Sequence, residues 1–180
     1  MDYKYYVQFW LLDLWSRKNV LTQKSLSLYE IDYKSLYIRG VRCVVYDVDD
    51  AIGEHKGVIS QKTIKLFTDL QLQGFKIALF SNSSKRRKAE LNKIFGRFGI
   101  YVVQRSDKPN PSGFLEVLEY YKIRSDEAAV VGDKLGTDMF GGYLAKYSER
   151  ILVKPFSSMF GGKTANITLR FVRFLENLLA

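Results

Sequence analysis

Carboxylates at two places in the sequence could together hold a divalent metal ion. Asp47 and Asp49 follow the apolar run Val41–Tyr46, and Asp133 follows Gly132 after another apolar run. Carboxylates that converge raise one another's pKa unless a cation lies among them. Oxygen ligands suit Mg²⁺, which takes few protein ligands and keeps several of its waters. If the fold brings these three side chains together, they form a candidate magnesium site.

Two further polar residues could add a phosphate-binding site. Ser81 offers a hydroxyl group after the run Phe75–Phe80, and Lys108 offers a positive charge just before Pro109. A metal, a lysine and a hydroxyl group around one point stabilise the charge on the oxygens of a phosphoryl group. A nearby carboxylate can then attack phosphorus and form an acyl phosphate. A second carboxylate, at Asp49, can protonate the leaving oxygen and afterwards take a proton from the attacking water.

Strand and helix patterns alternate along the part of the chain that carries these residues. Short, largely apolar runs predict strands at 41–46, 75–80, 101–103, 128–131 and 151–153. Helical signals are a cap at Ser60, apolar spacing over 91–98, Asn110–Pro111, a start near Thr137 and apolar spacing over 171–178. This alternation is typical of a parallel sheet with helices on both faces.

The predicted fold is therefore a three-layer, Rossmann-like α/β sandwich with a parallel sheet. Ligands of such sheets bind beyond the carboxyl ends of the strands. Asp47, Ser81 and Asp133 each follow a predicted strand, so we expect them to meet at one edge of the sheet. The gaps from Asp47 to Ser81 and from Ser81 to Lys108 leave no room for a cap domain. An open, capless site suits a substrate that is large or embedded in a surface.

The charge of the chain favours anionic partners. Lys and Arg number 28 against 19 acidic residues, which gives a net charge of +9. Such a surplus fits phosphate esters, nucleic acid or acidic lipid surfaces, and it fits a generally basic surface equally well. The single cysteine, Cys43, cannot form an internal disulfide and indicates a cytoplasmic chain. With one Cys and one His, the sequence excludes a structural zinc site built from its own residues.

Four polar clusters resemble, in order, the motifs of the haloacid dehalogenase superfamily. The clusters are Asp47–Ala51, Phe80–Asn82, Lys108–Pro109 and Gly132–Asp138. The stretches Gly132–Gly142 and Ile151–Pro155 further resemble the YqeG family, a subclass IIIA branch related to the phosphatidylglycerophosphate phosphatases. The resemblance covers residues 28–180 and implies a phosphatase. Its first motif departs from the family pattern, because Asp50 adds a carboxylate and Ala51 lacks a supporting hydroxyl group.

The resemblance also implies a role for each motif residue. Asp47 would be the nucleophile, and Asp49 would be the general acid and base. The implied phosphate-binding residues are Ser81, Asn82 and Lys108. The implied ligands of Mg²⁺ are Asp47, Asp49 through its backbone carbonyl, Asp133 and the nearby Asp138, which would orient a metal-bound water or Lys108.

The N-terminal part of the chain has a different composition. Residues 1–40 are rich in Tyr, Trp and Leu and carry no catalytic spacing, so they are interpreted as an extension before a phosphatase domain at 41–180. Within the extension, Tyr5–Trp15 is apolar but shorter than the roughly 20 residues that a spanning helix needs. It either packs on the sheet or on a partner, or contacts a membrane peripherally at head-group depth.

Three functions stay open. The first is a phosphomonoesterase that acts on phosphatidylglycerophosphate, in keeping with the resemblance and the basic charge. The second is a phosphatase of nucleic-acid ends, and the third is a non-catalytic module that uses the same fold for binding. The basic run Lys85–Lys88 at a helix start either flanks the open site, where it would receive an anionic group, or is a solvated helix face.

Overall fold

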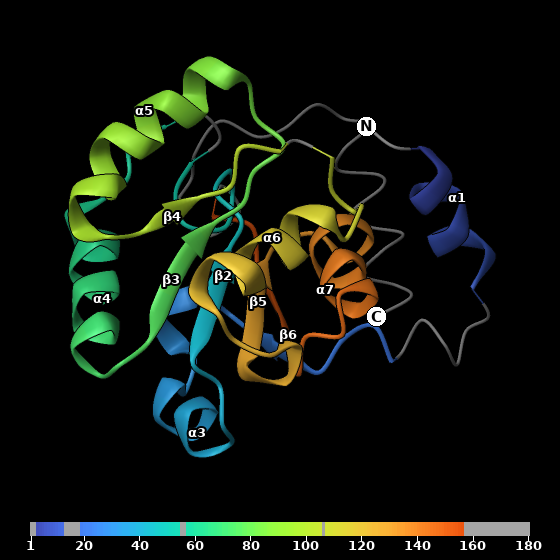
Figure 1. Cartoon of the computed structure of the whole chain (residues 1–180), viewed down its shortest axis with the longest axis horizontal. Helices are drawn as coiled ribbons and strands as arrows, with labels where there is room; N and C mark the ends of the chain where they lie inside the picture. The colour runs from blue at the N-terminus through green and yellow to red at the C-terminus, as the bar shows by residue number, and fades with distance from the viewer. Residues whose placement is uncertain (1–2, 13–18, 55–56, 106, 157–180) are drawn as a thin grey trace.

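The computed structural model describes residues 3–12, 19–54, 57–105 and 107–156 of the chain. Within these ranges six parallel strands form one sheet, in the order β1-β6-β5-β2-β3-β4 (Figure 1). The strands are β1 Gln23–Ser25, β2 Cys43–Tyr46, β3 Lys76–Leu79, β4 Tyr101–Val102, β5 Ala128–Gly132 and β6 Glu149–Val153. The predicted parallel α/β sheet is thus confirmed, and the five predicted strands agree with β2 to β6 within two residues at each end.

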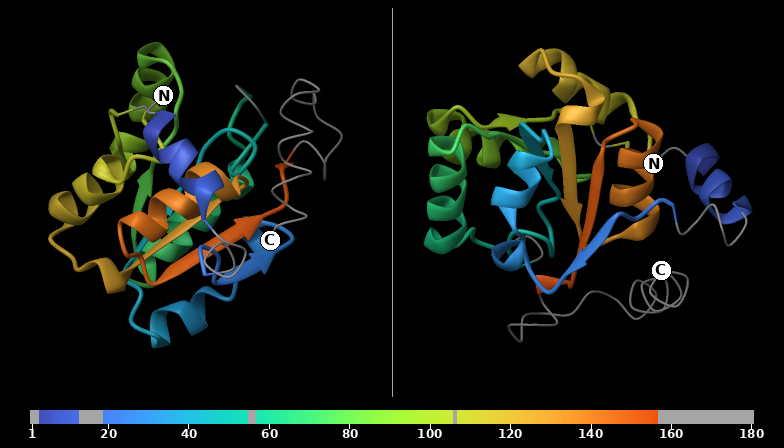
Figure 2. Two further views of the ribbon diagram at one scale, coloured as in Figure 1. Left: turned by 90° about the vertical axis from the view of Figure 1, so that its right-hand side faces the viewer. Right: turned by 90° about the horizontal axis from the view of Figure 1, so that it is seen from below.

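The helices are α1 Tyr3–Leu11, α3 Tyr33–Ile38, α4 Gln61–Leu72, α5 Lys85–Phe95, α6 Ser112–Tyr121 and α7 Phe140–Leu144. They cover both faces of the sheet, with α4 and α5 on one side and α6, α7 and α1 on the other (Figures 1 and 2). Short helical turns lie at Leu28–Glu30, Gly96–Phe98 and Ser125–Glu127, and a π-helical turn at Leu135–Met139 leads into α7.

Strand β2 shows why the sheet has helices on both faces. Its side chains alternate, so that Val44 and Tyr46 join one core cluster with Phe67 of α4, while Cys43 and Val45 join the other core cluster. All four strand residues are buried. Burying one such apolar side chain contributes roughly 1.5–3 kcal/mol, which explains why the run is apolar throughout and does not alternate with polar residues.

Side-chain caps begin the two helices that return the chain from the carboxyl edge to the opposite edge of the sheet. Ser60 accepts a hydrogen bond from the backbone N–H of Thr63 at the start of α4, as predicted, and Ser84 does the same for Arg87 at the start of α5. The helix predicted from Asn110–Pro111 begins at Ser112. The helix predicted over 171–178 lies outside the described residues.

The sheet and its core extend upstream of residue 41, into the segment that the sequence analysis assigned to an extension. Strand β1 pairs with β6, and Leu36 of α3 is buried in the core cluster that also contains Phe67 of α4. In α1, Phe9 is fully buried and its ring packs 5.4 Å from that of Phe140. β1 escaped the sequence analysis because this three-residue edge strand carries only polar side chains and has no apolar period.

Among the described residues, no separate domain is inserted at the carboxyl edge of the sheet. Along the described chain, β2 is followed only by a loop and α4 before β3, and β3 is followed only by α5 and a short turn before β4. The predicted absence of a cap domain agrees with this arrangement. In the portion of the chain that the structure describes, none of the helices has the length and apolar character needed to cross a membrane.

Candidate active site

The carboxylates predicted from the strand ends converge at the carboxyl edge. β2 lies between β3 and β5, so Asp47, Ser81 and Asp133 follow three adjacent strands. One carboxylate oxygen from each of Asp47, Asp133 and Asp138 lies within 4.8 Å of the other two. All three residues are buried. Parallel pairing therefore brings together residues that are far apart in the sequence.

Lys108 is a buried cation in contact with two of these acids. Its Nζ donates to Oδ1 of Asp47 at 2.5 Å and to Oδ1 of Asp138 at 2.6 Å. A third hydrogen bond runs 2.8 Å to the backbone carbonyl of Phe80, at the end of β3. The three hydrogens of the ammonium group are therefore all used, and the lysine is fixed against the carboxyl edge.

Asn82 holds the backbone of Lys108 in place. Its Nδ2 donates to the carbonyl oxygen of Lys108 at 3.0 Å, and its Oδ1 accepts from the N–H of Lys108 at 2.9 Å. The peptide bond between Lys108 and Pro109 is cis. The side chain predicted to bind phosphate is thus engaged in joining two loops of the site, and phosphate binding by Asn82 stays a prediction.

Lys134 belongs to the site although the sequence analysis assigned it no role. Its Nζ lies 3.0 Å from Oδ1 of Asp133 and 3.9 Å from Oδ2 of Asp47. Its backbone N–H donates to Oδ2 of Asp138 at 3.1 Å. In the sequence, only its position directly after Asp133 pointed to the site. Being next to a site residue does not by itself indicate that a side chain turns toward the carboxylates of the site.

Asp49 and Ser81 form a pair at the open side of the site. Ser81 donates to Oδ2 of Asp49 at 3.3 Å, and Asp49 is only half-buried. The neighbouring Asp50 is buried with φ at +70°, and its N–H donates to the carbonyl oxygen of Gly53. Ala51 lies in the core. Among the described residues, the close group of metal-type ligands includes neither Asp49 nor Asp50.

Comparison with known proteins identifies the family. A model of haloacid dehalogenase-like hydrolases matches residues 10–142. The chain belongs to this family. It is 27% identical over 137 residues to the probable phosphatase YqeG of Bacillus subtilis (strain 168), and that alignment covers 75% of this chain and 77% of YqeG. The predicted superfamily, the likeness to YqeG and the prediction of a phosphatase-type enzyme are confirmed.

Solved structures support the fold assignment. A hypothetical protein from Xanthomonas campestris superimposes with a TM-score of 0.52 at 17% identity, covering 69% of this chain and 71% of that one. An uncharacterized protein from Listeria monocytogenes serotype 4b superimposes with a TM-score of 0.50 at 13% identity, covering 74% and 99%. At such identities the likeness concerns the fold alone.

The charges of this hydrolase site shift the pKa values of its buried groups. Burial favours the neutral form of Asp47, but the positive charges of Lys108 and Lys134 outweigh burial and hold the pKa of Asp47 below its ordinary value. For Asp138, burial and the negative charge of Asp47 prevail and raise its pKa. Burial would lower the pKa of Lys108, yet its two carboxylate partners raise it. Lys108 is therefore a permanent cation.

The donor set of the hydrolase fits a divalent metal ion. Oδ2 of Asp47 is buried and accepts no hydrogen bond, and a carboxylate oxygen of Asp133 lies close to Asp47. Both oxygens of Asp138 already accept hydrogen bonds, from Lys108 and from the backbone of Lys134. Asp47 and Asp133 are thus the carboxylates best placed to hold Mg²⁺, while Asp138 is bound to the lysines.

A hollow of about 420 Å³ opens beside Asp133, beyond the ends of β1 and β6. Its wall combines two basic residues, Lys24 and Lys154, with the apolar Leu26 and Val153. Among the residues of the site, Asp133 is the one that borders this hollow.

Proposed function

We propose that the chain is a magnesium-dependent phosphomonoesterase that forms a covalent acyl phosphate on Asp47. One observation carries the proposal: Asp47 is a buried carboxylate with one oxygen held by Lys108 and the other without a hydrogen bond. A carboxylate with a lowered pKa stays ionised and can act as a nucleophile, and its environment already provides positive charge for a phosphoryl group.

Binding of the phosphate involves residues on both sides of Asp47. The hydroxyl group of Ser81 would donate to one phosphoryl oxygen, and Lys108 would exchange its hydrogen bond to Oδ1 of Asp47 for one to another phosphoryl oxygen. Asn82 would keep Lys108 in position. Asp47, Asp133 and the backbone carbonyl of Asp49 would hold Mg²⁺. When bound, the ion would neutralise negative charge on the phosphoryl oxygens.

The reaction then proceeds in two displacements. In the first, an oxygen of Asp47 forms a bond to phosphorus while the bond to the ester oxygen breaks, and Asp49 gives its proton to the departing alcohol. In the second, Asp49 takes a proton from water, whose oxygen attacks phosphorus and releases Asp47 and inorganic phosphate. Asp49 is half-buried and faces the open side, where an alcohol can leave and a water can enter.

The substrate that we propose is phosphatidylglycerophosphate, a phosphomonoester in the head group of a lipid. The likeness to YqeG, the net charge of +9 and the capless site support this choice. The face of α1 opposite the buried Phe9 also exposes apolar side chains, with Val7 55% and Leu11 79% exposed. Val7 and Leu11 share a helix face and could enter the interface of a membrane.

The decisive experiment measures phosphate release with Mg²⁺ from an aryl phosphate and from vesicles that contain phosphatidylglycerophosphate. Asp47→Asn should lower the rate at least about 10³-fold, because it removes the nucleophile. Asp69→Asn, in an exposed ion pair with Lys65 on α4, is the matched control and should keep the native rate. Acid quenching should trap phosphate on the native protein in a hydroxylamine-labile bond. Full activity in Asp47→Asn would refute the mechanism.

The same assay separates the substrate classes. Vesicle activity should fall several-fold in Leu11→Asp and persist in Val58→Asp, which changes an equally apolar residue, 93% exposed, in the loop before α4. A preference for phosphorylated oligonucleotide ends, with binding that weakens steeply as salt rises, would replace the lipid assignment with a nucleic-acid substrate. Binding of these ligands without turnover of any of them would indicate a non-catalytic module.

A further inference from the structure

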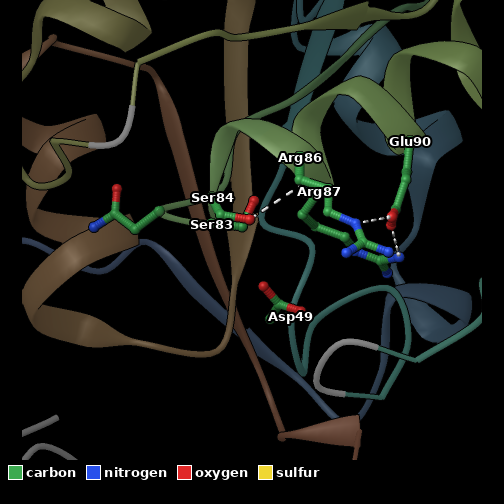
Figure 3. Close-up of a pocket in the computed structure, with 7 residues that line it drawn as sticks. Asp49, Ser83, Ser84, Arg86, Arg87 and Glu90 are labelled. Carbon is green, nitrogen blue, oxygen red and sulfur yellow. Dashed lines mark hydrogen bonds and ion pairs between the residues drawn. The ribbon is translucent and has the colours of Figure 1, made fainter.

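A second hollow, of about 690 Å³, opens on the other side of the site and shares one wall with it. Asp49 lines the hollow at the catalytic end, and Arg86, Arg87 and Glu90 of α5 line it at the far end (Figure 3). The close-up shows both guanidinium groups beside the carboxylate of Glu90 and on the same side of the hollow. The hollow therefore joins the catalytic edge to a basic wall.

The helix that supplies Arg86 and Arg87 to the hollow begins with a run of positive charge. The first turn of α5, Lys85–Lys88, consists of four basic residues and contains no acid. Positive charge is unfavourable at a helix N-terminus, where the backbone N–H groups already favour anions. This arrangement works against the folding of α5, and an anionic ligand bound in the hollow would offset it.

The two arginines of the hollow are held differently. Nη2 of Arg87 donates to the backbone carbonyl of Gly57 at 2.6 Å, and its side chain is only 16% exposed. The side chain of Arg86 is 91% exposed. Glu90 lies 3.4 Å from Arg86 and 3.5 Å from Arg87. The pair with Arg86 is exposed, and exposed ion pairs contribute only about 0.2–1 kcal/mol. The exposed guanidinium group of Arg86 can therefore turn from Glu90 to an anionic ligand, whereas that of Arg87 is held at the wall of the hollow by Gly57.

We propose that this hollow binds a second phosphate group of the substrate, carried by the alcohol that leaves. The inference rests on the proposed function, in which Asp49 protonates the departing oxygen. Because Asp49 also lines the hollow, the part of the substrate beyond that oxygen extends toward Arg86 and Arg87. Guanidinium groups match phosphate oxygens with two parallel hydrogen bonds. The substrate class is thus a phosphomonoester with a second phosphate, either in a lipid head group or in a soluble metabolite.

The test compares propane-1,3-diol monophosphate with the bisphosphate as soluble substrates. The native protein should show a kcat/KM about 10- to 100-fold higher for the bisphosphate, since charged hydrogen bonds of this strength correspond to about tenfold or more each. Arg86→Gln and Arg87→Gln should each lower this ratio about tenfold, and Arg86→Lys should restore part of it. Arg97→Gln, an exposed arginine just after α5, is the control and should leave the ratio unchanged.

Arg86→Gln is the variant that tests the site without disturbing the fold, because the side chain of Arg86 is exposed and pairs only weakly with Glu90. Equal kcat/KM values for both compounds in the native protein and in Arg86→Gln would overturn the inference and leave the proposed function intact. If neither compound is hydrolysed, the proposed function fails. Calorimetry of binding to the native protein and to Arg86→Gln then tests the proposed phosphate site by itself. The bisphosphate should then still bind to the native protein at least tenfold more tightly than the monophosphate, and Arg86→Gln should remove the difference. Equal binding of the two compounds to the native protein would overturn the inference.

A third arm identifies the source of the second phosphate. Phosphatidylglycerophosphate in vesicles and the soluble bisphosphate are compared at equal phosphate concentration, in the native protein and in Arg86→Gln. A larger loss on the vesicles assigns the hollow to the phosphodiester of a lipid head group, and a larger loss on the soluble compound assigns it to a metabolite. A loss seen only with phosphorylated oligonucleotides overturns the assignment to a small head group.

Discussion

Nζ of Lys108 donates a 2.5 Å hydrogen bond to Oδ1 of Asp47, across 61 positions of the sequence. Both side chains are almost fully buried, so neither charge is solvated by bulk water. A buried charge is tolerated only where paired charges and hydrogen bonds compensate for the lost water. Here Asp138 and the carbonyl of Phe80 accept the other two hydrogen bonds of the ammonium group. The lysine thus stabilises the site as well as facing the proposed phosphate.

Removing this cation should cost both activity and stability. In Lys108→Met, Asp47 and Asp138 stay buried without their shared partner, and breaking a buried pair in this way costs about 3–5 kcal/mol. We expect urea unfolding without Mg²⁺ to show such a loss in the free energy of unfolding, and kcat/KM to fall about 10²- to 10³-fold.

The control for this prediction is Lys65→Met. Lys65 lies on the exposed face of α4 and pairs with Asp69, so its removal should change the free energy of unfolding by less than about 0.5 kcal/mol. If Lys108→Met were as stable and as active as Lys65→Met, the buried ion pair could not be part of the site.

Magnesium should stabilise the native fold through Asp133. A ligand that binds only the folded state at about 100 times its Kd adds about 2.7 kcal/mol, so the melting temperature should rise with the concentration of Mg²⁺. Asp133→Asn removes one of the two carboxylates best placed for the ion and should abolish most of that rise. Asp126→Asn, in an exposed pair with Arg124, should keep the native rise. An equal rise in both variants would place the ion elsewhere.

Activity should require a residue without a side chain at position 132. A Cβ at this position would lie 2.5 Å from the Cβ, Cγ and Oδ2 atoms of Asp138. Gly132→Ala must therefore displace the carboxylate that holds Lys108, and we expect kcat/KM to fall about 10- to 100-fold. Gly96→Ala is the control, since a Cβ there comes no closer than 3.4 Å to another atom. Steady-state kinetics on both variants would test this, and native activity in Gly132→Ala would contradict the close approach.

Much of the site could be predicted from the sequence because its residues follow buried strands. β2, β3 and β5 are apolar on both faces, so each strand is visible as a continuous run, and the first polar residue after it lies at the carboxyl edge. That local signal places Asp47, Ser81 and Asp133 correctly with respect to the sheet. Pairing of parallel strands then brings them together without further information.

The remaining features depend on loop conformations that have no sequence period. The ammonium group of Lys134 reaches Asp133 because the chain turns sharply before the π-helical turn. The amide of Asn82 bonds to the backbone of Lys108, and Arg87 at the start of α5 bonds to the carbonyl of Gly57, because segments that are far apart in the sequence meet there. Such contacts are set by tertiary packing and cannot be derived from residue type and spacing.

Lys88 offers a test of pH dependence in a group that the proposed reaction does not use. It is buried on α5, and its Nζ has no hydrogen-bond partner among the described residues. Burial, and then the charge of Lys108, lower its pKa to about 8, although Asp107 and Glu116 act in the opposite direction. The unfolded chain has a pKa of about 10.4 for lysine, so the charged form costs the native state about 3 kcal/mol below pH 8.

The sign of the effect follows from proton binding. Between pH 8 and about 10.4 the unfolded chain binds more protons than the native protein at this residue, so the contribution of Lys88 to stability rises with pH. Lys88→Met should therefore be more stable than the native protein by about 2–3 kcal/mol at pH 7, and the difference should shrink toward pH 10.5. Urea unfolding at both pH values measures it. Lys93→Met, which changes an exposed lysine of the same helix, should show no such difference. If the free energies of unfolding of the native protein and of Lys88→Met changed in parallel with pH, Lys88 would be solvated.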